Sequence, residues 1–285
     1  MSERGKSSKR LAAGLDKPRL YVGDHDDERD VYTTAPGEVA AASIGDAGKD
    51  RPNEDSAAII PVNDTHVVLA VADGVGGMTG ARQASNLTVK ALRKALTGST
   101  EPPGRSLRTA ILDGIEAANR AILDSGSAGA STLALAEIGP DYVRPYHVGD
   151  SVVLICGQRG RLKLYTTPHS PVGFAMEAGL LDEKEAMAHT ELNLIFNVIG
   201  STDMRVEVGS EQPLAPRDTL VLASDGLTDN VLQDEIIAAV RAGPLDLAIN
   251  RVADLALARM RGTQANKPSK PDDLTALLFR RHPQR

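Results

Sequence analysis

The chain has 285 residues, enough for one large domain or two small ones with a substantial apolar core. Acidic residues outnumber basic ones, 38 against 32, and the formal charge of -6 argues against nucleic acid as a main partner. Cys156 is the only cysteine, which excludes an intrachain disulfide and a cysteine-based zinc cluster. No apolar segment has the length of a membrane span, and the N-terminus lacks the apolar core of a secretory signal. We therefore expect a cytoplasmic protein without a membrane partner.

Residues 1–36 are predicted to form a flexible N-terminal tail, because the basic run GKSSKR and the acidic run GDHDDERD show no apolar periodicity. One domain is expected from residue 37 to residue 281. Within it, short runs rich in Val, Ile and Leu are bounded by Gly, Asp and Pro, which is typical of strands. In chain order these runs are AAIIPV, THVVLAVAD, STLALAEI, YVRPYHVGD, SVVLICG, GRLKLYTT and DTLVLASDG.

Two long amphipathic segments, ARQASNLTVKALRKAL and RSLRTAILDGIEAANRAILD, separate the second and third predicted strands. Their apolar residues recur at helical spacing, and two further helices are predicted around QDEIIAAVRA and PLDLAINRVADLALARM. Strands and helix pairs in this order do not alternate as βαβ units do. The sequence therefore predicts an α+β fold with antiparallel sheets and helices packed on them.

Aspartates stand at the ends of four predicted strands: Asp73 after VVLAVA, Asp150 after YHVG, Asp225 after TLVLAS, and Asp272 before the terminal strand. A carboxylate at the end of a buried strand is costly unless it is paired, hydrogen-bonded or bound to a metal. Each aspartate taken singly is equally compatible with a turn cap. Four matched placements favour one cluster of acids, in which divalent cations would relieve the repulsion.

Oxygen ligands without a Cys or His cluster select hard ions, Mg²⁺ or Mn²⁺, over zinc. Two such ions about 3.5–4 Å apart can clamp a phosphoryl group and activate a water. The glycine after Asp73 fits this hypothesis, because Gly74 can offer its carbonyl to a metal and permits close approach of a substrate.

Several motifs that occur in order between residues 40 and 280 resemble those of the PP2C-like (PPM) metal-dependent Ser/Thr protein phosphatases. They are RPNEDS, DGVGGM, ASTLALA, VGDSVVLI, LVLASDGLTD and DDLT. The segment GLLDEKEAMAHTELNLIFNVIGS is similar to the flap of that family. The resemblance implies a four-layer αββα sandwich, in which two antiparallel β-sheets are flanked by helix pairs. It also implies hydrolysis of phosphoserine and phosphothreonine by a hydroxide that bridges two Mn²⁺ or Mg²⁺ ions.

The resemblance also implies roles for individual residues. Asp73 would bridge two metals, with the Gly74 carbonyl on one of them, and Asp225 and Asp272 would hold the other. Glu54 and Asp55 would orient metal-bound waters from the outer coordination shell. A third, weaker ion would lie between Asp225 and a further acid, Asp150.

Three positions depart from the pattern of the family. The phosphate-binding arginine usually lies three residues before the Asn of the NED motif, where this chain has Asp50; Arg51 is chosen over Lys49 because a guanidinium binds phosphate in a two-pronged manner. Val75 stands where some relatives carry a histidine proposed as general acid. Val152 replaces the arginine of the family's GDSR motif.

The sequence thus indicates a Ser/Thr phosphoprotein phosphatase that opposes a Ser/Thr kinase. A pseudophosphatase, a binding module with the same fold, is the alternative, and the displaced arginine keeps it open. A serine hydrolase built on Ser151 is disfavoured, because the six histidines are scattered and none is predicted to be its partner. In the predicted tail, Thr33 and Thr34 follow an acidic run, which makes them candidate kinase targets.

Overall fold

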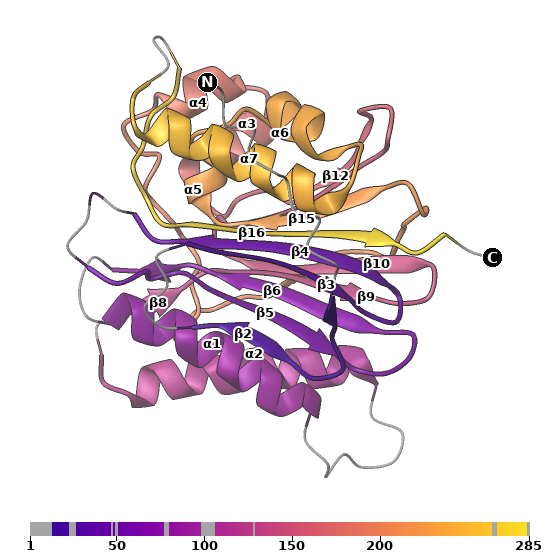
Figure 1. Ribbon diagram of the computed structural model, residues 1–285. Coiled ribbons are helices and arrows are strands. Elements are labelled where there is room, and N and C mark those ends of the chain that lie inside the picture. Colours follow the sequence, from indigo (N-terminus) through magenta and orange to yellow (C-terminus); the bar gives the residue numbers. More distant parts are fainter. Residues whose placement is uncertain are drawn as a thin grey trace, which may run out of the picture.

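Two seven-stranded sheets pack face to face, and a helix pair covers the outer face of each (Figure 1). This arrangement comes from a computed structural model, which describes residues 13–22, 27–46, 48, 51–76, 80–97, 106–127, 129–263 and 267–283. The predicted α+β class and four-layer αββα sandwich are therefore confirmed. The described helices include none that is both long and apolar enough to cross a bilayer.

The first sheet joins the two ends of the chain, because the C-terminal strand β16 pairs in antiparallel register with β4 along its whole length. Its strands are antiparallel except for the short pair β1 and β3. In spatial order they are β1 (Ala13–Gly14), β3 (Asp27–Thr33), β4 (Gly37–Ile44), β16 (Leu274–Arg281), β15 (Thr219–Ala223), β11 (Val152–Cys156) and β12 (Leu162–Tyr165).

The second sheet is antiparallel throughout. In spatial order its strands are β13 (Glu207–Val208), β10 (Tyr142–Val148), β9 (Leu133–Ile138), β6 (Val67–Ala72), β5 (Ser56–Pro61) and β2 (Arg19–Tyr21), and β14 (Gln212–Pro213) also pairs with β10. A separate two-stranded ribbon joins β7 (Gly74–Val75) to β8 (Ala130–Ser131). This ribbon follows directly on Asp73.

The four long helices lie where the amphipathic segments predict them. The pair α1 (Gly80–Thr97) and α2 (Leu107–Asp124) covers the second sheet, and the pair α6 (Gln233–Val240) and α7 (Leu245–Met260) covers the first (Figure 1). Short helices, α3 (Pro171–Glu177), α4 (Glu183–Met187) and α5 (Asp225–Thr228), lie near one end of the first sheet.

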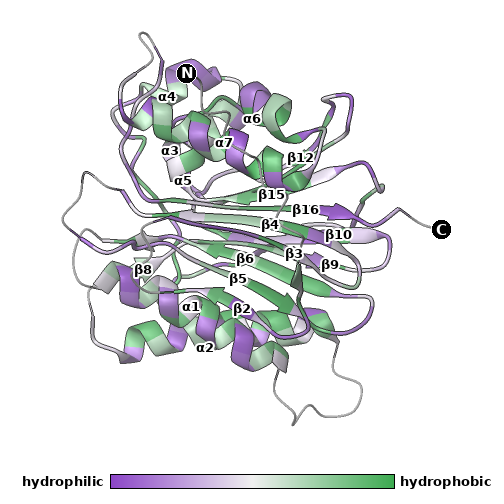
Figure 2. Cartoon of the chain, viewed as in Figure 1, coloured by the Kyte–Doolittle hydropathy of each residue, from purple (hydrophilic) through white to green (hydrophobic). Residues whose placement is uncertain are grey.

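Each sheet is buried on both faces, which explains why the strands read as continuous apolar runs. All six residues of β6 are buried, and β5 and β6 are coloured as hydrophobic along most of their length in Figure 2. Between the sheets, small side chains such as Ala41, Ala57 and Ala134 pack with larger ones such as Phe279. Cys156 is buried, and burial raises the pKa of its thiol to about 11.

The predicted flexible tail is wrong for the residues of that segment that the structure describes. Residues 27–30 of the acidic run that suggested disorder belong to β3, which pairs with β4 from Asp27 to Thr33. Its charges are paired: the guanidinium of Arg29 binds Asp27 in the same strand and Asp254 on α7, the latter with an Nη1–Oδ1 distance of 2.7 Å. Residues 1–12 and 23–26 lie outside the described part of the chain.

The Thr33–Thr34 pair also differs from the expectation. Thr34 is 3% exposed, and its hydroxyl donates a 2.7 Å hydrogen bond to the carbonyl of Gly37 in the β3–β4 turn. Because a kinase needs an accessible hydroxyl, the folded turn does not support the proposed phosphorylation of Thr34.

Candidate metal centre

All five aspartates that the sequence singled out meet at one end of the sandwich, where both sheets contribute. Asp55 precedes β5 and Asp73 follows β6 in the second sheet, whereas Asp225 and Asp272 flank β15 and β16 of the first sheet. Asp150 lies in the connection from β10 to β11, which passes from one sheet to the other. Asp225 is the first residue of α5 rather than the last residue of a strand.

Asp73 is the centre of the group. Its pKa is raised well above the usual range by burial first, and then by the carboxylates of Asp55, Asp225, Asp150 and Asp272. Such mutual influence requires that the acids lie close together in a region of low dielectric constant.

The backbone of Asp73 is held by Thr132, the residue directly before β9. The Asp73 amide donates to Thr132 Oγ1 at 3.1 Å, and the Thr132 amide donates to the Asp73 carbonyl at 2.8 Å. Gly74 is required here by packing: a Cβ at this position would lie 2.4 Å from the carbonyl oxygen of Ala81 and 2.8 Å from that of Glu54. The glycine that the sequence singled out thus lets three chain segments approach closely beside Asp73.

The NED segment is fixed in the same region. Asp55 Oδ2 accepts a 2.7 Å hydrogen bond from Ser224 Oγ, directly before Asp225 in the chain. The Glu54 amide donates to Asp273 Oδ2 at 3.0 Å, so an acid that the sequence analysis passed over holds this segment in place. Asp273 adjoins Asp272, and the DD doublet was the available signal.

Arg51 lies at the edge of the centre. Its Nη1 contacts the Glu54 carboxylate, and its Nη2 is 3.8 Å from Asp272 Oδ1. The structure therefore brings this arginine beside two of the predicted acids. Lys49 and Asp50, the other two positions considered for phosphate binding, lie outside the described residues.

The residues fit divalent cations. Burial raises the pKa of Asp55 to about 8, with further contributions from Asp273 and Asp225, and burial followed by Asp225 raises the pKa of Asp150 to about 7. Within the described part of the chain, the buried Oδ1 of Asp150 has no hydrogen-bond partner. Bound cations would favour the ionised form of these carboxylates, and an all-oxygen donor set suits Mg²⁺ or Mn²⁺.

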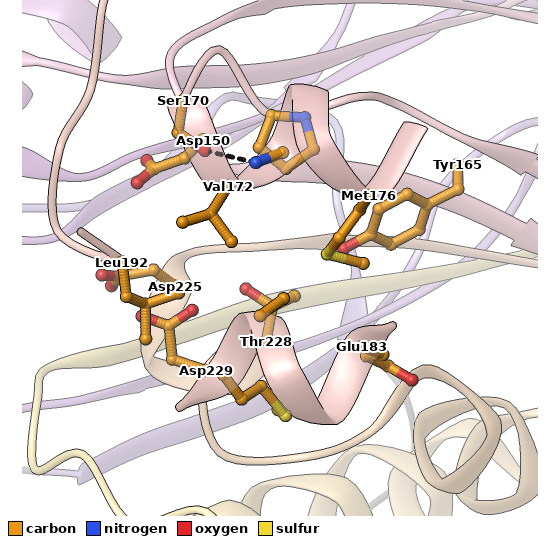
Figure 3. A pocket seen from close by; sticks show the side chains of 14 residues that line it. Asp150, Tyr165, Ser170, Val172, Met176, Glu183, Leu192, Asp225, Thr228 and Asp229 are labelled. Carbon is orange, nitrogen blue, oxygen red and sulfur yellow. Dashed lines mark hydrogen bonds between the residues drawn. The ribbon is translucent and has the colours of Figure 1, made fainter. Parts of the chain in front are cut away.

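Two charged residues of the centre were missed by the sequence analysis. Lys270 Nζ lies 2.7 Å from Asp225 Oδ2 and 2.6 Å from Asp229 Oδ2. Burial raises the pKa of Asp229 to about 8, assisted by Asp225 and opposed by Lys270. Asp150, Asp225 and Asp229 line a pocket whose other walls include Val172, Met176 and Tyr165 (Figure 3).

A second polar cluster consists of His147, His169 and Glu207. His169 Nδ1 accepts the Gly149 amide at 3.1 Å, so its proton is on Nε2, which is 3.2 Å from Glu207 Oε2. His147 Nε2 is 3.0 Å from the Thr167 carbonyl and must also carry a proton. Neither Nε2 atom has a free lone pair for a metal. His169 instead braces the Gly149 turn that presents Asp150, a role that the sequence did not reveal.

The two valines that depart from the family pattern are accommodated by packing. Val152 begins β11 and is 2% exposed in the core between the first sheet and its helices. Val75 belongs to the β7–β8 ribbon and is paired with Ala130.

Comparison with known proteins agrees with this geometry. The sequence model of protein phosphatase 2C matches residues 36–258. A serine/threonine phosphatase stp of Listeria welshimeri is 28% identical over 239 residues, which cover 81% of this chain and 90% of that protein.

Two solved structures have the same fold. The serine/threonine phosphatase of S. agalactiae has a TM-score of 0.70 and 25% identity, covering 93% of this chain and 100% of its own. The catalytic domain of the serine threonine protein phosphatase PstP, in complex with two manganese ions, has a TM-score of 0.66 and 24% identity. The match covers 85% of this chain and 96% of that domain.

The sandwich and its acidic centre define the class of phosphatases that work with hard divalent cations. Within that class, the chain belongs to the protein phosphatase 2C family.

Proposed function

We propose that this chain is a Mn²⁺- or Mg²⁺-dependent phosphatase that hydrolyses phosphoserine and phosphothreonine in proteins. The observation that carries the proposal is the convergence of Asp55, Asp73, Asp150, Asp225 and Asp272 at one end of the sandwich. So many buried acids would destabilise a fold that had no cation to place among them.

We assign the ions to particular residues. Asp73 would bridge two ions, the Gly74 carbonyl would complete one site, and Asp225 and Asp272 would hold the other. Asp225 belongs to the same group of interacting carboxylates as Asp73, and Lys270 Nζ binds its Oδ2. Glu54 and Asp55 would serve in the outer shell, where hydrogen bonds such as that from Ser224 to Asp55 fix the orientation of the carboxylate.

When bound, two such ions activate a water and neutralise the charge of the phosphoryl group. The residues of the chain provide position and charge around them. Arg51 would bind the phosphoryl oxygens, since its guanidinium lies between Glu54 and Asp272 at the edge of the centre. Val75 has no proton to donate, so the side chain at this position cannot assist departure of the serine or threonine oxygen.

The pseudophosphatase alternative is not favoured, because the predicted metal acids are all present and assembled. A phosphothreonine peptide provides the test. We expect phosphate release that requires Mn²⁺, stops in EDTA and disappears in Asp225→Asn, while Asp64→Asn, an exposed control, retains it. A folded protein that binds Mn²⁺ but releases no phosphate would favour the pseudophosphatase.

The cellular setting follows from the chemistry. We infer that the enzyme opposes a Ser/Thr kinase in the cytoplasm, because its substrates must first be phosphorylated by such a kinase with ATP. Comparison of phosphoproteins in cells with and without the enzyme would test this inference, and accumulation of phosphoserine and phosphothreonine sites is the expected result.

A further inference from the structure

One side of the metal centre contains a positive charge that belongs to the chain itself. Lys270 Nζ lies between Asp225 Oδ2 and Asp229 Oδ2, at 2.7 and 2.6 Å. Asp150 lines the same pocket as these two acids (Figure 3), and its Oδ1 is a buried oxygen without a hydrogen-bond partner among the described residues. Three carboxylates thus surround one small region, and an ammonium group lies among them.

The fold specifies the position of this lysine. The amide of Lys270 donates to Asn230 Oδ1 at 2.8 Å, and Asn230 Nδ2 donates to the Lys270 carbonyl at 2.9 Å. Asn230 is fully buried and also donates to the carbonyl of Gly226, which ties this contact to α5. Pro271 restricts the backbone that follows. The ammonium is therefore held in place and is not a surface charge that happens to lie nearby.

We propose that Lys270 is a built-in cation that occupies the place among Asp150, Asp225 and Asp229 where a further divalent ion would otherwise bind. The inference rests on the proposed function, since it concerns the same centre. At these distances, in a partly buried site, a fixed positive charge repels a second cation strongly. The chain then takes up the two ions assigned to Asp73, Asp225 and Asp272, and no third ion.

The stoichiometry of Mn²⁺ tests this directly. Equilibrium dialysis followed by elemental analysis should give two Mn²⁺ per chain for the wild type and three for Lys270→Met. Lys267→Met is the matched control, because Lys267 lies in the same segment but is exposed and pairs with Glu235 at 3.0 Å. It should retain two ions. Lys270→Arg preserves the charge and should also retain two.

A double variant identifies the location of the additional ion. Lys270→Met combined with Asp150→Asn should return to two Mn²⁺, because one of the three carboxylates is then neutral. Three ions in the wild type, or two in Lys270→Met with normal unfolding by circular dichroism, would overturn the proposal. Fewer than two ions in the wild type, together with no phosphate release, would instead contradict the proposed function itself.

Discussion

Removal of metal should make the stability of this protein fall as pH rises. Without cations, the pKa values of Asp55 and Asp229 are about 8 and that of Asp150 is about 7, against an ordinary value of 3.8. Folding raises the pKa of such a carboxyl. At pH values between its unfolded and folded pKa, it is protonated in the folded chain and ionised in the unfolded chain. The unfolded state therefore binds fewer protons, and the free energy of unfolding decreases with pH in this window.

The expected magnitude follows from the number of protons retained. Each fully protonated group lowers the free energy of unfolding by about 1.4 kcal/mol per pH unit. Asp55 and Asp229 are near their midpoints at pH 8 and influence their neighbours, so we expect a total loss of about 1.4–3 kcal/mol between pH 7 and 8. His147 changes the stability in the opposite direction, because burial lowers its pKa below 6.5. Its contribution therefore falls mainly at pH values below the range from 7 to 8.

Urea unfolding followed by far-UV circular dichroism at pH 7 and pH 8 measures this effect. In EDTA the free energy of unfolding should decrease between pH 7 and pH 8. With Mn²⁺ at about 100 times its dissociation constant, this decrease should vanish and the free energy of unfolding should rise by about 2.7 kcal/mol per site. Asp55→Asn should be more stable than the wild type in EDTA at pH 8, since it removes a buried acid and keeps an acceptor for Ser224. The reasoning would be refuted if the free energy of unfolding in EDTA stayed constant or rose with pH, or if Asp55→Asn were less stable than the wild type.

Three further substitutions test residues that lie next to the metal-binding aspartates. Gly74→Ala places a Cβ 2.4 Å from the carbonyl of Ala81, so we expect about 1–3 kcal/mol of destabilisation in urea and weaker Mn²⁺ binding by calorimetry; unchanged binding would contradict it. Ser224→Ala removes the hydrogen bond to Asp55, and stability in Mn²⁺ should fall by about 1–3 kcal/mol, with Ser224→Thr as the milder control. Arg51→Ala should lower kcat/KM about tenfold to hundredfold with Mn²⁺ binding preserved, whereas an unchanged kcat/KM would exclude phosphate contact by Arg51.

The clustering of the acids was easier to predict from the sequence than the residues around them, for a physical reason. A buried carboxylate at a strand end needs compensation wherever the strand lies, so Asp73, Asp150 and Asp225 were recognisable without knowledge of the contacts. Their convergence also follows once the strands form two packed sheets. Lys270 was not recognisable in this way, because its partners, Asp225 and Asp229, lie 45 and 41 residues away in the chain.

The N-terminal segment shows the opposite outcome. The run DERDVYT has the composition of a disordered tail, yet it forms β3 because β4 offers a complete edge for pairing. Its Arg29 finds an acidic partner on α7, more than two hundred residues later. Local composition contains no information about such distant partners, so the domain boundary at residue 36 was placed too late.

Anomalous diffraction at the manganese absorption edge, from crystals grown with Mn²⁺, tests the central claim most directly. We predict two anomalous peaks about 3.5–4 Å apart, both within coordination distance of the Asp73 carboxylate. One of them should also contact Asp225 and Asp272. Peaks that lie away from Asp73, or a single peak at His147 and His169, would contradict the assignment of the metal centre.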